Sequence, residues 1–128
     1  MIDLYTWTTP NGRKVSILLE ELGVDYVCHP IDITKSEQSA ADYLAINPNG
    51  KIPAIVDRDA GRTLFESGAI MIYLADRHGR FLPSPGEARD EVMIWLMWQM
   101  AGFGPMLGQA HHFLHYAPDA SAYAAERY

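Results

Sequence analysis

Apolar positions recur along the chain with the periods of strands and helices in turn. Alternating apolar and polar residues from Ile2 to Thr6 predict a strand, and the turn-forming residues Thr8 to Gly12 follow it directly. From Val15 to Leu22 apolar side chains return every three or four residues, which predicts a helix that ends at Gly23. A second strand-like stretch covers Val24 to Ile33. Because a helix separates the two strands, we expect them to be parallel.

The next segments predict a short helix, a hairpin and a longer helix. Ser39 to Ile46 has the length and pattern of a short helix. Ile52 to Val56 and Arg62 to Phe65 are strand-like, and the turn residues between them predict a hairpin. After Glu66 an apolar helical pattern continues to a stop at Gly79. The predicted order is βαβαββα, which is an α/β fold.

A proline- and glycine-containing segment predicts a boundary between two domains. It is Leu-Pro-Ser-Pro-Gly at residues 82–86, so we place one domain at residues 1–82 and the beginning of a second, all-helical domain at residues 87–128. The most apolar windows, Ile70 to Ala75 and Val92 to Gly102, are too short or too interrupted to span a bilayer of about 30 Å. We expect both to be buried helix faces, with the aromatic and methionine residues of the second forming a core stripe or a cleft wall.

Composition and charge restrict the partners and the compartment. Sixteen acidic against ten basic residues give a net charge of −6 without a basic cluster, so we expect neither nucleic acid nor a membrane as a partner. Cys28 is the single cysteine, which excludes an intrachain disulfide, and we expect it to be a small core residue of the second strand. The N-terminus lacks the regions of a signal peptide. These features together predict a cytoplasmic protein.

Four features together resemble the N-terminal domain of glutathione transferases. They are the βαβαββα order, the Ile52-Pro53 step before a strand, the Glu66-Ser67 pair that opens the last helix, and a polar loop after the first strand. The resemblance covers Met1 to about Arg80. It implies a thioredoxin-like fold that binds glutathione, an extended tripeptide with an anionic γ-glutamyl end, a central thiol and a second carboxylate.

The two ends of glutathione have candidate partners in this domain. Unpaired N–H groups at the helix that begins at Ser67 can bind a carboxylate, and Glu66 can accept the ammonium group, although Ser67 could also be a plain helix cap. A cis bond before Pro53 would free the Ile52 N–H and C=O to pair with the peptide, whereas a trans turn proline is the alternative. The resemblance implies the cis form.

Two further polar residues match family positions that contact the ligand. Gln38 and Lys51 correspond to positions that contact the γ-glutamyl and glycyl ends of glutathione. The alternative for both is the ordinary polarity of a solvated loop. The resemblance therefore adds them to the expected binding residues.

The thiol of glutathione should face the loop from Thr8 to Gly12. There the N-terminus of the first helix and nearby hydroxyl or amide donors favour a thiolate. Other classes of the family place a tyrosine, a serine or a cysteine at this point, and this loop has none of them in the expected place. Thr8 aligns best with the serine of theta-like enzymes, whereas Thr9 and Asn11 match the nu-class pattern Thr-Pro-Asn-Gly-x-Lys. We expect Tyr5, inside the first strand, to pack rather than to catalyse.

A second stretch supports the nu class. Gly102 to Phe113 resembles the segment after the first C-terminal helix of nu-class enzymes and of their yeast prion-protein relatives. Arg127 matches a family arginine that reaches glutathione from the helical domain, where its fork suits a carboxylate; an exposed helix arginine is the alternative. Arg13 departs from the histidine that relatives often carry, which could alter the outer site but leaves Thr9 and Asn11 intact.

Three histidines near the C-terminus raise the hypothesis of a metal site. His111, His112 and His115 have spacings that can share a helix face. No cysteine or acidic ligand accompanies them at zinc-like spacing, and the family pattern has the same histidines without a metal. We therefore expect no metal.

The sequence thus predicts a glutathione-dependent disulfide-bond reductase with glutathione as co-substrate. The alternatives are a glutathione transferase that conjugates electrophiles, and a catalytically silent regulatory module that binds glutathione. Family members continue for roughly another helical domain, and we expect a homodimer formed through the N-terminal domain. The expected catalytic residues are Thr9 and Asn11, and the expected binding residues are Thr8, Gln38, Lys51, Ile52, Pro53, Glu66, Ser67 and Arg127.

Overall fold

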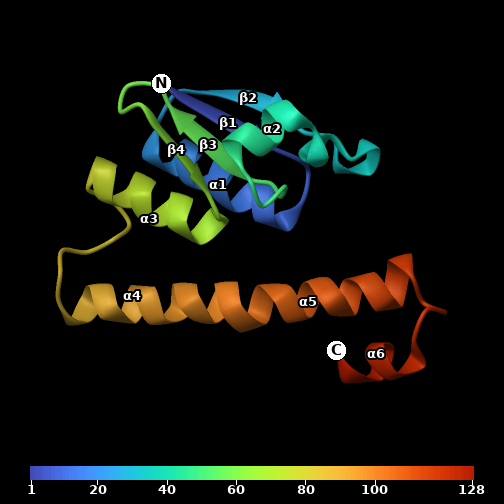
Figure 1. Ribbon diagram of the computed structural model, residues 1–128. Helices are drawn as coiled ribbons and strands as arrows, with labels where there is room; N and C mark the ends of the chain where they lie inside the picture. Colours follow the sequence, from blue (N-terminus) through green and yellow to red (C-terminus); the bar gives the residue numbers. More distant parts are fainter. The chain divides into compact units, whose positions relative to one another are not determined.

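The computed structural model describes residues 1–128, which form two units, Met1–Pro83 and Ser84–Tyr128. The first unit contains a four-stranded sheet in the order β2-β1-β3-β4 (Figure 1). Its strands are β1 (Ile2–Thr6), β2 (Tyr26–Pro30), β3 (Ala54–Asp57) and β4 (Arg62–Phe65). β1 pairs with β2 in parallel, and the pairs β1–β3 and β3–β4 are antiparallel. The predicted α/β fold is confirmed.

Three helices complete the first unit. They are α1 (Pro10–Leu22), α2 (Ala41–Ile46) and α3 (Ser67–His78), and two short 3-10 turns, Ile33–Lys35 and Glu37–Ser39, precede α2. Helices α1 and α3 lie on one side of the sheet and α2 lies on the other (Figure 1). Successive side chains of a strand point to opposite faces of the sheet, so each face offers side chains for a helix to pack on.

The hydrophobic core lies between the sheet and helices α1 and α3. Leu4, Leu19 and Ile55 are completely buried there, and Ile70 and Leu74 of α3 join them. The full buried cluster is Ile2, Leu4, Val15, Leu18, Leu19, Ile55, Ile70 and Leu74. The predicted burial of the window from Ile70 to Ala75 is therefore confirmed.

Helix α1 begins five residues before the periodic segment that predicted it. Thr9 is its N-cap, Pro10 occupies the first turn, and Gly23 closes it in the left-handed conformation. A proline in the first turn and a threonine cap are favoured at helix starts, because the first N–H groups have no partner inside the helix. The polar residues that predicted a loop thus lie mostly within the helix.

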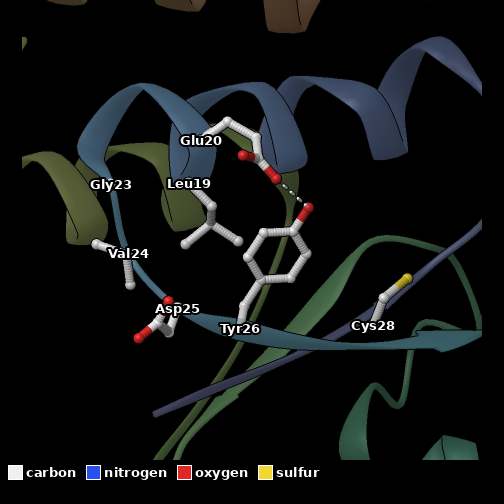
Figure 2. A pocket seen from close by; sticks show the side chains of 7 residues that line it. All are labelled: Leu19, Glu20, Gly23, Val24, Asp25, Tyr26 and Cys28. Atoms are coloured by element: carbon white, nitrogen blue, oxygen red, sulfur yellow. Dashed lines mark hydrogen bonds between the residues drawn. The ribbon is translucent and has the colours of Figure 1, made fainter.

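The prediction for Cys28 was wrong, because the strand that carries it lies at the edge of the sheet. Cys28 is exposed rather than a core residue. Figure 2 shows its side chain on the face of β2 toward α1, beside an open groove that the end of α1 and the following segment line. Along this groove Tyr26 donates a hydrogen bond to Glu20 Oε1 at 2.8 Å, which ties β2 to α1. The strand is also shorter than expected, and ends at Pro30, which has no N–H to donate.

The second unit is entirely helical. It consists of α4 (Glu87–Trp98), a π-helical segment Gln99–Phe103, α5 (Gly104–His111), a second π-helical segment His112–Tyr116, and α6 (Ala122–Arg127). None of the helices in the chain combines the length and apolar character needed to cross a membrane.

The expected burial of Val92 to Gly102 is not observed. Ile94, Trp95 and Trp98 are 65%, 59% and 51% exposed, and no residue of the second unit is buried. Within this unit no other helix covers the apolar side chains of α4. The apolar residues thus have the spacing of a buried helix face but are not packed against another element.

Candidate functional site

The N-cap and the first turn of α1 present two hydrogen-bond donors, Thr9 and Asn11, directly after β1. Thr9 Oγ1 accepts a hydrogen bond from the Gly12 N–H at 3.3 Å, and no acceptor takes the hydroxyl proton of Thr9. Thr8 and Asn11 are exposed, and the Asn11 amide makes no hydrogen bond to the protein. Because the helix dipole is positive at this end, the two donors face a position that favours an anion.

Gly12 makes this loop sterically feasible. It is buried, and a β-carbon at this position would lie 2.5 Å from the Trp7 carbonyl oxygen and would also collide with Thr6 Oγ1. A side chain here would force the first turn of α1 away from the end of β1. The absence of a side chain at Gly12 therefore allows Thr9 and Asn11 to lie close to the end of β1.

The turn before β3 is held by the side chain of Asn47, which is almost fully buried. Asn47 Oδ1 accepts a hydrogen bond from the Asn49 N–H at 2.9 Å, and Asn47 Nδ2 donates to the Lys51 carbonyl oxygen at 2.6 Å. The Tyr43 hydroxyl donates to the same oxygen at 2.6 Å. Burial raises the pKa of Tyr43, so its phenol stays a neutral donor.

The peptide bond between Ile52 and Pro53 is cis, as the family resemblance implied. Neither the N–H nor the C=O of Ile52 makes a hydrogen bond within the protein. Ile52 is half-buried, Pro53 is buried, and the neighbouring Lys51 is exposed. An extended peptide could therefore pair with the Ile52 backbone as with one more strand.

Glu66 and Ser67 lie where β4 passes into α3. Glu66 adopts φ 69° and ψ 115°, a conformation that costs a residue other than glycine about 1–3 kcal/mol. Such outliers often occur at binding sites, because the surrounding structure fixes a backbone geometry that a ligand uses. Ser67 is buried at the first turn of α3, at the positive end of the helix dipole.

Two residues that were not predicted for the site act on the Glu66 carboxylate, one through a hydrogen bond and one through its charge. Asn49 Nδ2 donates a hydrogen bond to Glu66 Oε1 at 3.4 Å. Burial lowers the pKa of Lys14 on α1, and the negative charge of Glu66 partly opposes this effect. Lys14 ends the pattern Thr-Pro-Asn-Gly-x-Lys, and Asn49 belongs to a turn with the sequence Asn-Pro-Asn-Gly at residues 47–50. Neither pattern by itself indicates an interaction with Glu66.

Gln38 carries an unsatisfied acceptor in the same region. Its Oε1 atom is buried and has no hydrogen-bond partner, which is uncommon for a buried oxygen. Gln38 lies in the second 3-10 turn, and its carbonyl oxygen is 3.4 Å from where a β-carbon of Gly50 would lie. Gln38 thus neighbours the turn that precedes Ile52, and its side chain can accept a hydrogen bond from a ligand.

Arg127 is the one expected site residue outside the first unit. It ends α6 in the second unit and is exposed. The other nine belong to the first unit, at the loop before α1 and its first turn, the 3-10 turn, the turn before β3 and the junction of β4 with α3. The hydrogen bond from Asn49 to Glu66 joins two of these segments, the turn before β3 and the start of α3.

Tyr5 packs, in agreement with its position inside β1. Its ring stacks on His29 with the centroids 4.7 Å apart and lies at a tilt to Tyr43. Next to it, the buried carboxylate of Asp3 receives two hydrogen bonds of 2.5 Å from Arg58 and lies 2.7 Å from His29 Nε2. The hydrogen bonds from Arg58 lower the pKa of Asp3 to about 2, against the opposing effect of burial. This cluster supports the sheet and does not join the site.

The histidines near the C-terminus do not form a metal site with other ligands. The rings of His111 and His115 lie 4.7 Å apart. No group of three or more histidine, cysteine or acidic side chains in the chain could hold a metal ion.

Comparisons with known proteins identify a matching family and similar proteins. The family described as "Glutathione S-transferase, N-terminal domain" matches residues 1–76. The disulfide-bond oxidoreductase YfcG of Escherichia coli is 50% identical over 133 aligned positions, which cover all of this chain and 62% of that protein. The chain therefore spans less than two thirds of this relative.

Two solved structures are similar over 98% of the chain. A glutathione transferase family member from Pseudomonas fluorescens, with two glutathione molecules bound, has a TM-score of 0.92 and 45% identity. A glutathione transferase from Pseudomonas putida, with one glutathione disulfide bound per subunit, has a TM-score of 0.92 and 39% identity. The matches cover 58% and 57% of those two chains.

Proposed function

Since this chain belongs to the glutathione S-transferase family, we propose that it is the glutathione-binding part of a disulfide-bond reductase. The thiolate of bound glutathione attacks one sulfur of a disulfide, a mixed disulfide forms, and the other sulfur leaves as a thiolate. A second glutathione then attacks the mixed disulfide. This step releases glutathione disulfide and the second thiol, so two glutathiones are oxidised for each disulfide reduced.

The observation that carries this proposal is the pair of donors at the N-terminus of α1. The Thr9 hydroxyl and the Asn11 amide have no acceptor within the protein, and the positive end of the helix dipole favours a thiolate beside them. Cys28 is the chain's one cysteine and lies on β2 rather than in this loop, so glutathione supplies the thiol. The likeness to the disulfide-bond oxidoreductase YfcG supports this reaction.

The remaining candidate residues hold the rest of glutathione. The N–H groups at Ser67 bind the γ-glutamyl carboxylate and Glu66 binds the ammonium group. Ile52 pairs with the peptide backbone, held in place by Pro53. Gln38 supports this assignment most directly, because its buried Oε1 needs a donor that the protein does not provide.

Three outer residues complete the proposed site. Lys51 is exposed beside the turn and attracts the glycyl carboxylate as a point charge. Thr8 borders the thiol position from the loop before α1. Arg127 contributes a guanidinium that can bind a carboxylate with two parallel hydrogen bonds.

The proposal is tested by comparing two reactions catalysed by the same chain. Steady-state reduction of 2-hydroxyethyl disulfide by glutathione is measured beside conjugation of glutathione to chlorodinitrobenzene, for the wild type and for Asn11→Ala. The control is Glu21→Ala, an exposed residue at the opposite end of α1. We expect disulfide reduction to exceed conjugation. Asn11→Ala should slow reduction by about tenfold or more, because a hydrogen bond to a charged group contributes about 1.5–3 kcal/mol.

Other outcomes point to the two alternatives. Conjugation that exceeds disulfide reduction would indicate a conventional glutathione transferase. Glutathione binding by calorimetry without turnover in either assay would indicate a regulatory binding module. Equal activities of Asn11→Ala and the wild type would remove Asn11 from the catalytic residues.

We also propose that the protein acts in the cytoplasm as a homodimer, and that the second unit begins an all-helical domain. The exposed single cysteine suits a reducing compartment. The exposed apolar side chains of α4, such as Trp95 and Trp98, require a covering surface. The helical character of the whole unit supports the domain assignment.

A further inference from the structure

The peptide group between Lys51 and Ile52 is fixed by two side chains. Its carbonyl oxygen accepts one hydrogen bond from the Tyr43 hydroxyl and one from Asn47 Nδ2, each at 2.6 Å. A carbonyl oxygen has two lone pairs, so both of its acceptor positions are occupied. Both donors are 3% exposed or less, and water therefore competes weakly for them.

Fixing this carbonyl also fixes the N–H group of Ile52. The only cis peptide bond of the chain is the one between Ile52 and Pro53, so the bond between Lys51 and Ile52 is trans. In a planar trans peptide the C=O and the N–H point in opposite directions. The Lys51 carbonyl points toward α2 and the interior of the turn, so the Ile52 N–H points away from them and has no partner there.

We propose that Tyr43 and Asn47 are positioning residues, which hold the Ile52 N–H in the direction that pairs with the backbone of bound glutathione. This inference rests on the proposed function, because it assumes that Ile52 pairs with that ligand. Rotation of the peptide plane would break both bonds at the Lys51 oxygen at once. The ligand therefore meets an N–H whose direction is already set, and binding does not bear the cost of ordering it.

The two residues contribute from different elements. Asn47 acts within the turn, where its Oδ1 also accepts the Asn49 N–H. Tyr43 acts from α2 and reaches the turn only through its hydroxyl, while its ring lies against Tyr5 of β1. Removing the Tyr43 hydroxyl thus removes one bond to the Lys51 oxygen and leaves the ring contact in place.

The test uses Tyr43→Phe with Tyr73→Phe as the matched control. The Tyr73 hydroxyl also donates to a buried oxygen, Asp57 Oδ2 at 2.7 Å, and Asp57 ends β3 at the far side from the site. The full chain is used for each variant. Calorimetry measures the Kd for glutathione, amide NMR measures the shift of the Ile52 N–H on saturation, and a thermal melt measures the loss of stability.

We expect Tyr43→Phe to bind glutathione about fivefold more weakly, as loss of one neutral hydrogen bond predicts. Its Ile52 amide should also shift less on binding. Tyr73→Phe should lose stability but keep the wild-type Kd and the wild-type shift of Ile52. A purely structural role for Tyr43 would instead change the melting temperature in both variants and the Ile52 shift in neither.

A second substitution keeps the test decisive. Asn47→Asp preserves the acceptor for the Asn49 N–H but removes the donor to Lys51, and we expect it to weaken binding further; if it fails to fold, Tyr43→Phe alone decides. Wild-type affinity and an unchanged Ile52 shift in Tyr43→Phe would overturn the inference and leave the proposed function standing. A wild type that does not bind glutathione would overturn both.

Discussion

Thr9 combines two functions in one hydroxyl group, and substitutions can separate them. Its oxygen caps α1 by accepting the Gly12 N–H at 3.3 Å, and its proton is available for a bound thiolate. Thr9→Ala removes both functions. Thr9→Ser keeps both, and Thr9→Asp keeps the cap acceptor but has no proton to donate.

The expected magnitudes follow from these two contacts. Loss of a threonine cap lowers the free energy of unfolding by about 1 kcal/mol. A hydrogen bond to a charged group contributes about 1.5–3 kcal/mol, and one pKa unit corresponds to about 1.4 kcal/mol. Thr9→Ala should therefore raise the pKa of the bound glutathione thiol by about 1–2 units. Thr9→Asp should restore the stability and raise that pKa at least as much, because its charge repels the thiolate.

Two measurements separate the functions. Urea unfolding gives the stability of each variant, and the ultraviolet absorbance of the thiolate, followed against pH with glutathione bound, gives the pKa of the thiol. Equal thiol pKa values in the wild type and Thr9→Ala would refute the donor role. Equal unfolding free energies in the same pair would refute the capping role independently.

Two further predictions concern the support of the site. Asp3→Asn should lower the free energy of unfolding by about 1 kcal/mol at neutral pH. The difference between a pKa of about 2 and the ordinary 3.8 corresponds to about 2 kcal/mol, and solvent around the partly exposed Arg58 reduces this contribution. Because the pKa of Asp3 is lowered in the folded protein, this contribution is complete above about pH 4 and is lost as the pH falls toward 2. Urea unfolding should therefore give the wild type and Asp3→Asn similar free energies of unfolding near pH 2. A difference between them that stays constant with pH would contradict this prediction. Gly12→Ala should lower the free energy of unfolding by about 1–3 kcal/mol and weaken glutathione binding, because the new methyl group meets the Trp7 carbonyl. Unchanged melting and affinity would disprove this steric role.

The pattern of apolar and polar residues predicted the bounds of secondary structure correctly where the chain forms regular, half-buried elements. The strands Ile2–Thr6, predicted from alternation, and Arg62–Phe65, predicted as part of a hairpin, have the expected bounds. The start of α1 was placed too late, because Pro10 is typical of turns and of first helical turns alike. Cys28 was misjudged because burial of a strand depends on its place in the sheet, and β2 lies at an edge.

The sequence predicted only part of the site. The family resemblance implied the cis bond at Pro53, which local sequence could not distinguish from a trans turn. Asn49 and Tyr43 were missed because their hydrogen bonds join different segments of the chain, and Lys14 because its electrostatic interaction is with Glu66, which is distant along the chain. Such contacts depend on tertiary packing, and a periodicity of two or of 3.6 contains no information about them.

The turn held by Asn47 has a consequence for the kinetics of binding. Its hydrogen bonds are complete without any ligand, so this turn need not rearrange before glutathione docks. The turn therefore adds no slow conformational step to association, and the association rate should vary little among variants of the turn. Differences in affinity will appear mainly as differences in the dissociation rate, and therefore in the time for which each glutathione remains available to attack a disulfide.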